Sequence, residues 1–302
     1  MKKVVILMST YNGEQYLREQ LDSILSQTYK NIEILIRDDG STDSTISIID
    51  EYKKRQAHLS YYQGENLKPA KSFMDLLSKA SDADYYAFCD QDDVWKPEKL
   101  ETAIFKLENL PPEDPNIYIG ALTFVDKDLN IIGHRKDTLY KLTFAESWIY
   151  CVATGCTMVM NNVLKDLINS IRVDNIQMHD IWAFRMCLAY GGNAIYDYTP
   201  YILYRQHGNN VVGANTSIRR KWIERIKKTC HLKQGERWLM SLEMKKHCID
   251  SIPEPQRKVL NTIVNYKSSF VDKMTLLFGK EYQTNNKYQN FIFRCAVLLN
   301  RF

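Results

Sequence analysis

The chain has few of the residues that mark disordered or fibrous proteins. Its 302 residues include only 12 glycines and 8 prolines, and no internal repeat or low-complexity stretch occurs. Apolar residues make up 45% of the chain and charged residues 25%, which is the usual balance of a folded protein. A chain of this length can bury a sizeable core, so we expect one large domain or one domain with a substantial extension.

Long hydrophobic runs are missing as well. The opening MKKVVILMSTYNG places two lysines before an apolar stretch, as a secretory signal does, but only Val4 to Met8 is uninterrupted. That run is too short for the apolar region of a signal and far too short to span a bilayer. We therefore expect the protein to remain in the cytoplasm.

The sequence also lacks any CxxC pair. Its seven cysteines are odd in number and scattered, so they do not suggest a disulfide framework. They are Cys89, Cys151, Cys156, Cys187, Cys230, Cys248 and Cys295. We expect reduced thiols with mostly structural roles.

Positive charge is concentrated in one segment. Between Ile218 and Lys258 there are 12 Lys and Arg residues against five Asp and Glu, while the whole chain carries only +4. A helix with a cationic and an apolar side is predicted from Arg219, Arg220, Lys221, Trp222, Arg225, Ile226, Lys227 and Lys228. Such a helix can lie on an anionic bilayer at the inner face of the plasma membrane, or it can be a solvated face over an ordinary core. Nucleic-acid binding is not expected, because no recognised binding module accompanies the charge.

Up to about residue 130, short β-rich runs alternate with helical ones, which is typical of a parallel sheet covered by helices. The expected strands are Val4–Ser9, Ile32–Arg37, Leu59–Tyr62, Tyr85–Cys89 and Ile117–Phe124. The expected helices are Glu14–Ser26, Ser44–Arg55, Ala70–Lys79 and Pro97–Glu108. The pattern predicts an α/β fold with a mostly parallel central sheet.

The rest of the sequence is first mixed and then helical. Met178–Tyr190 is typical of an amphipathic helix that the following glycine pair ends, and Ala194–Tyr196 and Tyr201–Tyr204 are expected to be short strands. From Thr216 onward the pattern is helical. We predict one domain over residues 1–215 and a helical C-terminal extension over residues 216–302.

Polar clusters follow three of the expected strands. They are STYN at 9–12, RDDGSTD at 37–43 and DQDD at 90–93. In an open α/β sheet the ligand site lies beyond the carboxyl ends of the strands. We therefore expect the three clusters to face one crevice.

The DQDD cluster predicts a cation. If the chain stays extended there, Asp90 and Asp92 point to the same side, and two close carboxylates repel unless a cation lies between them. Mg²⁺ or Mn²⁺, with open positions for phosphate oxygens, fits this need. The alternative is an acidic helix start before Pro97. An EF-hand fits poorly, because Val94 and Trp95 occupy its fifth and sixth positions.

The RDDGSTD cluster combines a turn with two adjacent acids. Gly40 permits a positive φ, and Asp43 or Ser44 can begin the next helix. A turn followed by a helix start does not explain the two adjacent acids at the strand end. A carboxylate there can accept the imide N–H of a uracil or thymine base. A phosphatase-type DxDGT is excluded, because Arg37 stands two positions before Asp39.

The motifs together resemble a known family. STYN, RDDGSTDST, ENLKPAKSFM at 65–74 and DQDDVW followed by PEKL look like the nucleotide-binding half of the family 2 glycosyltransferases. That family has the GT-A fold, a Rossmann-like sheet flanked by helices, and acts with inversion. MHD at 178–180 and YRQHGNNVVGA at 204–214 resemble the branch of bacterial rhamnosyltransferases that builds cell-wall and capsular polysaccharides. The resemblance covers about residues 4 to 215.

The resemblance implies a set of residues that bind the donor nucleotide. Asp39, with Thr10, Tyr11 and Asn12, would hold the base and ribose. Asp38 would assist them.

The resemblance also implies a metal and diphosphate site. Asp90 and Asp92 would form the DxD metal site, with Asp92 the direct ligand and Asp90 also near the donor. His207 would return to the metal or the diphosphate, although a lone histidine can equally be a surface residue. Arg205 could meet the diphosphate through bidentate hydrogen bonds.

Asp180 occupies the position of the family's catalytic base, where many members have Glu-Asp. The start of a helix favours its ionised form, which a base needs, but a helix cap is the alternative explanation. Trp95 is a candidate for the sugar or acceptor pocket, with a core position as the alternative. Gly155 and Cys156 are expected to let the acceptor approach the backbone. His179 is a further candidate for the acceptor or sugar pocket, and its role is left open.

The sequence therefore predicts an inverting, metal-dependent glycosyltransferase. By resemblance, the donor is dTDP-L-rhamnose, and the acceptor is a hydroxyl of a lipid-linked cell-surface polysaccharide. A UDP-hexose donor is the first alternative. Nucleotidyl transfer normally needs a glycine-rich basic loop after the first strand, and STYNGEQYL has one glycine and no lysine. A non-catalytic sugar- or nucleotide-binding protein is the remaining alternative.

Overall fold

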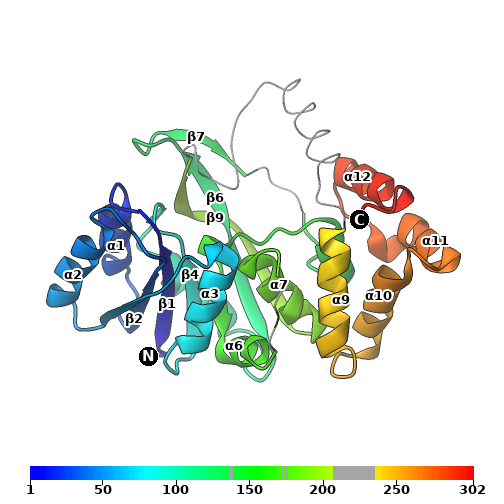
Figure 1. Ribbon diagram of the computed structural model, residues 1–302, viewed down its shortest axis with the longest axis horizontal. Helices are drawn as coiled ribbons and strands as arrows, with labels where there is room; N and C mark the ends of the chain where they lie inside the picture. The colour runs from blue at the N-terminus through cyan, green and yellow to red at the C-terminus, as the bar shows by residue number, and fades with distance from the viewer. Residues whose placement is uncertain (136–138, 172, 174–175, 207–234) are drawn as a thin grey trace.

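A computed structural model describes residues 1–135, 139–171, 173, 176–206 and 235–302 of the chain. Within these residues the centre of the molecule is a mixed sheet with the strand order β3-β2-β1-β4-β8-β6-β9-β5, and β7 pairs with β6 (Figure 1). Helices pack against both faces of this sheet. The predicted α/β class is confirmed.

The first four strands form the parallel part of the sheet. They are β1 (Val4–Thr10), β2 (Ile32–Asp38), β3 (Leu59–Gln63) and β4 (Tyr85–Cys89). The accompanying helices are α1 (Leu17–Leu25), α2 (Thr45–Arg55), α3 (Lys68–Lys79) and α4 (Lys99–Leu107). Each of these elements was predicted from the sequence, and only the ends differ by a few residues.

The strand β1 is apolar from Val4 to Met8 because both of its faces are covered. Val5 and Leu7 pack into the core cluster that contains Phe73 of α3. Val4 and Ile6 point the other way, into the cluster formed with α1, α2 and α4. Successive side chains of a strand alternate between its two faces, so a strand buried on both has no room for polar residues.

The second half of the sheet is antiparallel in part. It contains β5 (Val94–Trp95), β6 (Asn116–Val125), β7 (Ile131–His134), β8 (Val159–Asn161) and β9 (Asn193–Arg205). The prediction of two short strands at Ala194–Tyr196 and Tyr201–Tyr204 was wrong, because both belong to the single strand β9. The pairing of β9 with β6 shifts register near Pro200, a residue that has no N–H to donate to its neighbour.

The C-terminal helices build the other end of the molecule (Figure 1). They are α9 (Glu236–Cys248), α10 (Glu254–Asn265), α11 (Phe270–Phe278) and α12 (Lys287–Leu298), and short 3₁₀ segment η2 (Lys280–Tyr282) precedes α12. Met240, Met244 and Leu260 join the same core cluster as Trp182. That residue lies on α7 (His179–Ala189), which stands between α9 and the sheet with α5 (Phe144–Ile149) and α6 (Asn162–Asn169) nearby. The division at residue 215 remains a prediction, because residues 207–234 lie outside the described ranges.

The described part of the chain contains neither a disulfide nor a helix suited to crossing a membrane. Its six cysteines are free thiols, as expected for reduced structural residues, and Cys89, Cys156, Cys187 and Cys248 are buried. No helix in the same residues is long and apolar enough to span a bilayer.

Candidate active site

The ends of β1 and β4 are joined by the amide of Gln91. The Tyr11 N–H donates to Gln91 Oε1 (2.9 Å), and Gln91 Nε2 donates to the Tyr11 carbonyl (3.1 Å). A Cβ on Gly13 would lie 2.3 Å from Gln91 Oε1, so a larger residue there would displace the Gln91 amide from this position. Gln91 therefore fixes the STYN cluster against the DQDD cluster.

The ends of β1 and β2 are joined through Asn12. Its N–H donates to Ser41 Oγ (2.8 Å), and its Oδ1 accepts from the Thr42 N–H (2.8 Å). Asn12 adopts the left-handed conformation, with a φ of 48°, which asparagine tolerates better than most residues. The three polar clusters thus meet at one edge of the sheet, as the sequence predicted.

Two of the predicted nucleotide ligands are engaged within this loop. Asp38 is fully buried and accepts from the N–H groups of Gly40 and Ser41 and from Thr10 Oγ1 (3.0 Å). The Ser41 hydroxyl also donates to it. Gly40 has a φ of +82°, which the turn requires. The side chains of Asp38 and Thr10 thus shape the loop, whereas Tyr11 is 48% exposed and accessible to a ligand.

Asp39 lies beside Asp38 but bonds in a different direction. Its carboxylate pairs with the buried Arg37 guanidinium, accepts from Ser72 Oγ (2.9 Å) and accepts from the Leu67 N–H (3.1 Å). These contacts tie the end of β2 to the start of α3. A carboxylate has about four acceptor positions, so Asp39 retains capacity for a ligand N–H. Its role in base recognition stays a prediction.

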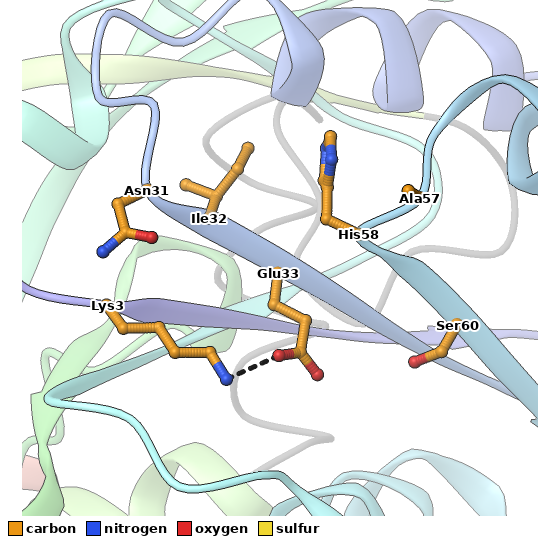
Figure 2. A pocket seen from close by; sticks show the side chains of 7 residues that line it. All are labelled: Lys3, Asn31, Ile32, Glu33, Ala57, His58 and Ser60. Carbon is orange, nitrogen blue, oxygen red and sulfur yellow. Dashed lines mark ion pairs between the residues drawn. The ribbon is translucent and has the colours of Figure 1, made fainter.

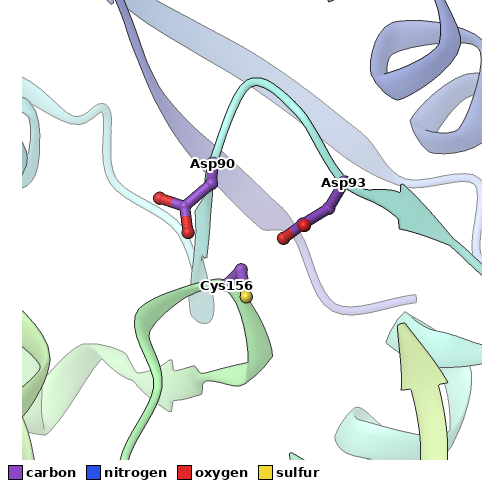
Figure 3. A group of neighbouring side chains, drawn as sticks. All are labelled: Asp90, Asp93 and Cys156. Carbon is purple, nitrogen blue, oxygen red and sulfur yellow. The ribbon is translucent and has the colours of Figure 1, made fainter. Parts of the chain in front are cut away.

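The DQDD segment bends at residues 91 and 92 instead of staying extended. Asp90 and Asp93 therefore converge above the Cys156 thiol, with ligand atoms of the three residues within 4.8 Å of one another (Figure 3). The Arg205 N–H donates to Asp93 Oδ1 (3.1 Å). Asp93 Oδ2 is buried and has no hydrogen-bond partner of ordinary geometry among the described residues. Asp93 was not predicted as a ligand, because in an extended strand it would point away from Asp90 and Asp92.

This cluster is short of positive charge. Loss of solvation on burial, followed by the charges of Asp92 and Asp180, raises the pKa of Asp90 to about 7. Burial and the charges of Asp92 and Asp90 raise the pKa of Asp93 well above its usual range. Carboxyl groups whose ionised forms are this unfavourable gain most from a nearby cation.

A buried lysine lies close to the cluster, and its charge interacts with that of Asp93. Lys99 is 1% exposed, its ammonium lies 3.4 Å from the Trp95 ring centroid, and it has no hydrogen-bond partner among the described residues. Burial lowers its pKa to about 8. Trp95 itself is 2% exposed and belongs to a core cluster, so the structure places it under the site and not on a sugar-binding surface.

The donor atoms suit a divalent metal ion. Carboxylate oxygens are preferred by Mg²⁺ and Mn²⁺, and a thiol is better tolerated by the softer Mn²⁺. The unpartnered Oδ2 of Asp93 and the raised pKa of Asp90 are both consistent with a site that needs a cation. Asp92 lies close enough for its charge to act on both, which keeps it among the candidate ligands.

Asp180 lies in the first turn of α7 and faces the same cluster. Its Oδ2 accepts from the Gly155 N–H (3.1 Å), and its Oδ1 accepts from the Ile181 N–H (2.7 Å). Burial raises its pKa from 3.8 to about 6, although these backbone hydrogen bonds oppose the shift. Asp180 is thus mostly ionised at neutral pH yet more basic than an ordinary carboxylate. Both properties suit a general base.

His179 is a packing residue. Its ring stacks on Phe73 at 4.0 Å between centroids and meets Phe88 edge-on at 4.8 Å. Neither ring nitrogen has a hydrogen-bond partner among the described residues, and burial lowers the pKa to about 3. A Cβ on Gly155 would lie 2.5 Å from Nε2, so the neutral ring fits against Gly155 only because that residue has no side chain.

Arg205 braces the acidic loop. Its side chain is 1% exposed, and Nε donates to the Asp92 carbonyl (3.0 Å). The two terminal nitrogens bond to the Lys127 carbonyl and to Glu19. The backbone N–H bonds to Asp93, and Nε bonds to Asp92. The guanidinium nitrogens are thus engaged by protein groups, and the predicted contact with a diphosphate is not seen. His207, also proposed for the metal site, lies outside the described residues.

A separate hollow of about 310 Å³ lies at the opposite, amino-terminal edge of the parallel strands. It is lined by Lys3, Asn31, Ile32, Glu33, Ala57, His58 and Ser60 (Figure 2). The ion pair between Lys3 and Glu33 (2.6 Å) crosses it. None of the residues singled out from the sequence lies there, so the candidate site is the edge that carries the acidic cluster.

Comparison with known proteins gives the family. A model of the glycosyl transferase family 2 matches residues 5–168, which is more than half of the chain. The chain belongs to glycosyltransferase family 2. The dTDP-rhamnosyl transferase RfbG of Shigella flexneri is 32% identical over 238 residues, which cover 71% of this chain and 76% of that protein. An uncharacterized glycosyltransferase of Rickettsia typhi is 32% identical over 171 residues, covering 53% and 51%.

Solved structures show that this family 2 glycosyltransferase has the GT-A fold. S. aureus TarS 1-349 in complex with UDP-GlcNAc has a TM-score of 0.60 at 17% identity and covers 99% of this chain and 82% of its own. The mannosyltransferase PcManGT from Pyrobaculum calidifontis, in complex with GDP-Man and Mn²⁺, has a TM-score of 0.53 at 15% identity, covering 100% and 88%. At these identities the likeness concerns the fold.

The raised pKa of Asp180 predicts how the stability of this glycosyltransferase changes with pH. The folded state holds the proton more tightly than the unfolded state, so the stability contribution of Asp180 falls as pH rises from about 4 through about 6. We expect wild type to lose up to about 3 kcal/mol relative to Asp180→Asn across that window. Thermal unfolding at pH 4 and pH 8 in metal-free buffer measures most of this difference. Asp166→Asn, at a position 67% exposed, is the control, and an equal response of both variants would contradict the prediction.

Proposed function

We propose that the protein is an inverting rhamnosyltransferase that moves L-rhamnose from dTDP-L-rhamnose to a hydroxyl of a lipid-linked cell-surface polysaccharide, as in cell-wall or capsule synthesis. Family membership supports sugar transfer in general. The choice of donor draws on the similarity to the rhamnosyl transferase RfbG. The observation that carries the chemistry is the buried Asp180, whose charge acts on Asp90 of the acidic cluster.

The proposed reaction is a single displacement. Asp180 takes the proton of the acceptor hydroxyl while the oxygen attacks the anomeric carbon from the face opposite the diphosphate. The bond from that carbon to the diphosphate oxygen breaks, and the nucleoside diphosphate leaves with the electron pair. No covalent bond between sugar and enzyme is needed. Asp180 is held in position by the Gly155 and Ile181 N–H groups.

The acidic cluster would serve the leaving group. Asp90, Asp92 and Asp93 would hold Mg²⁺ or Mn²⁺, which neutralises the charge that develops on the diphosphate. Arg205 and Gln91 keep the loop in its bent form. Tyr11 and Asp39 would contact the nucleotide from the neighbouring strand ends.

A UDP-hexose donor is the second candidate. A structurally similar protein, S. aureus TarS, was solved with UDP-GlcNAc. The carboxylate of Asp39 can accept the imide N–H of uracil and of thymine alike. The nucleotide base therefore does not separate the two donors, and the difference must come from the sugar.

The lipid-linked acceptor would place the protein at the cytoplasmic face of the membrane. The basic segment at 219–228, which the sequence suggested for membrane contact, lies outside the described residues. We also keep, as a proposal, the division into a transferase domain over 1–215 and a helical extension over 216–302.

A panel of nucleotide-sugars tests the donor. The protein is incubated with Mg²⁺ or Mn²⁺ and dTDP-rhamnose, UDP-glucose, UDP-GlcNAc or GDP-mannose, and the released nucleoside diphosphate is measured. We expect release from dTDP-rhamnose to exceed release from the others. Release from a UDP-sugar alone would support the second candidate and refute the rhamnosyl assignment.

Asp180→Asn is expected to reduce transfer by a factor of roughly 10² to 10⁴, because a general base contributes about that much. Nucleotide binding, measured by calorimetry, should survive since the amide preserves the shape of the side chain. Asp166→Asn on the surface of α6 is the matched control. Equal losses of transfer and of nucleotide binding in Asp180→Asn would count against its role as the base.

Nucleotide binding is expected to depend on metal. The affinity for dTDP or UDP should fall roughly tenfold or more in Asp92→Ala or after chelation, because the diphosphate would then face uncompensated carboxylates. Asp82→Ala, an exposed position before β4, serves as the control. An affinity that stays the same in chelator would remove the metal hypothesis.

A further inference from the structure

Helices α11 and α12 leave large apolar side chains in water. On α11, Phe270 is 75% exposed, Val271 73% and Phe278 70%. On and after α12, Phe291, Leu298 and Leu299 are 56–66% exposed. Single exposed apolar residues are ordinary, but several on neighbouring elements mark an interaction surface. These six residues are called the C-terminal apolar patch below.

On α12, helical spacing gathers two of these residues on one face. On α12, Lys287, Phe291, Arg294 and Leu298 follow one another at intervals of four, three and four, which places them on one side of the helix. Phe293 and Val297 are buried on the opposite side. On α11, Leu276 and Leu277 are buried, whereas Phe270 and Phe278 at the two ends of the helix are 75% and 70% exposed.

The two helices are held together next to the patch. Lys273 Nζ of α11 donates to the Leu298 carbonyl (3.1 Å) and to Asn300 Oδ1 (3.0 Å) at the end of α12. The start of α11 and the end of α12 are therefore neighbours, at the end of the molecule remote from α2 (Figure 1). The patch residues thus lie on two adjacent helices.

The C-terminal segment that carries the apolar side chains also has an excess of positive charge. From Tyr266 to Phe302 there are six Lys and Arg residues against two Asp and Glu. The basic residues are Lys267, Lys273, Lys280, Lys287, Arg294 and Arg301. On α12, Lys287 and Arg294 alternate along the helix with Phe291 and Leu298. Long basic side chains can keep their charge in water or at a headgroup while their stems lie on an apolar layer.

We propose that the C-terminal apolar patch is a docking surface for an anionic lipid bilayer. Phe and Leu side chains would enter the boundary between headgroups and acyl chains, and the basic residues would meet the headgroup phosphates. This assignment deepens the proposed function and rests on it only for its purpose, which is access to a lipid-linked acceptor.

Charge decides between this occupant and a second copy of the chain. A two-fold contact through the patch would place the cationic groups of both copies, Lys287 and Arg294 among them, in one interface, which opposes association. An anionic headgroup layer provides the opposite charge along the whole surface. The combination of exposed aromatic residues and excess lysine is thus matched by a membrane and not by the protein itself.

Vesicle sedimentation of the full chain tests the proposal. The protein is mixed with vesicles of phosphatidylcholine alone or of phosphatidylcholine with phosphatidylglycerol, with no donor present. We expect binding to the mixed vesicles that weakens at high salt, because headgroup attraction is screened. The double variant Phe270→Ser, Phe278→Ser should bind at least about tenfold more weakly. Lys287→Glu with Arg294→Glu should lose the preference for anionic lipid.

Phe105→Ser is the matched control, since Phe105 on α4 is 68% exposed and lies outside the patch. Binding that is unaffected by the patch variants, or lowered equally by Phe105→Ser, would overturn the assignment. A dimer in sedimentation equilibrium that the double phenylalanine variant dissociates, without vesicle binding, would assign the patch to a second copy.

The same variants separate this proposal from the proposed reaction. Release of nucleoside diphosphate from a soluble nucleotide-sugar should be unchanged in the patch variants. Wild-type protein that binds vesicles but releases nothing from any donor would leave the docking surface standing and refute the proposed function. Transfer without vesicle binding would refute the docking surface alone.

Discussion

The candidate site depends on the repulsion among carboxylates gathered at one edge of the sheet. Asp90, Asp92 and Asp93 come from one bend, and Asp180 approaches from the first turn of α7. Burial, followed by the charges of Asp92 and Asp180, raises the pKa of Asp90 to about 7, and burial raises the pKa of Asp180 to about 6. Holding such groups together without a cation is electrostatically unfavourable. A bound metal would relieve the repulsion at Asp90, and the raised pKa of Asp180 would make it a better proton acceptor.

Many polar contacts in the surrounding structure stabilise that arrangement. Gln91 joins two strand ends, Asn12 joins another pair, and Arg205 supports the acidic bend from below. Each of these side chains is polar, yet each bonds chiefly to protein groups. A polar side chain near the site is therefore not necessarily available to a ligand, because several of them serve to shape the site.

The fold was largely predictable because its first half follows simple patterns. Strands buried on both faces are continuous apolar runs, and the helices between them show their own period, so Val4–Thr10 and Thr45–Arg55 could be recognised locally. The pattern failed at Asn193–Arg205, where Pro200 and the register shift interrupt an otherwise continuous strand. In the site, Asp93 was not predicted because its position depends on a bend in the chain. Arg205 was predicted to bind the diphosphate because the protein groups that it contacts lie far away in the sequence.

The sequence by itself determined the α/β class, the family and the three polar clusters at the strand ends, since these depend on residue order and local periodicity. Tertiary structure alone decided which acids converge, that His179 is packed between Phe73 and Phe88, and that Trp95 lies in the core. It also brought Lys273 against the end of α12 and so made neighbours of two helices that both carry exposed apolar residues. Burial and charge act through space between residues distant in the chain, and their effects on pKa and exposure exist only once those residues are brought together.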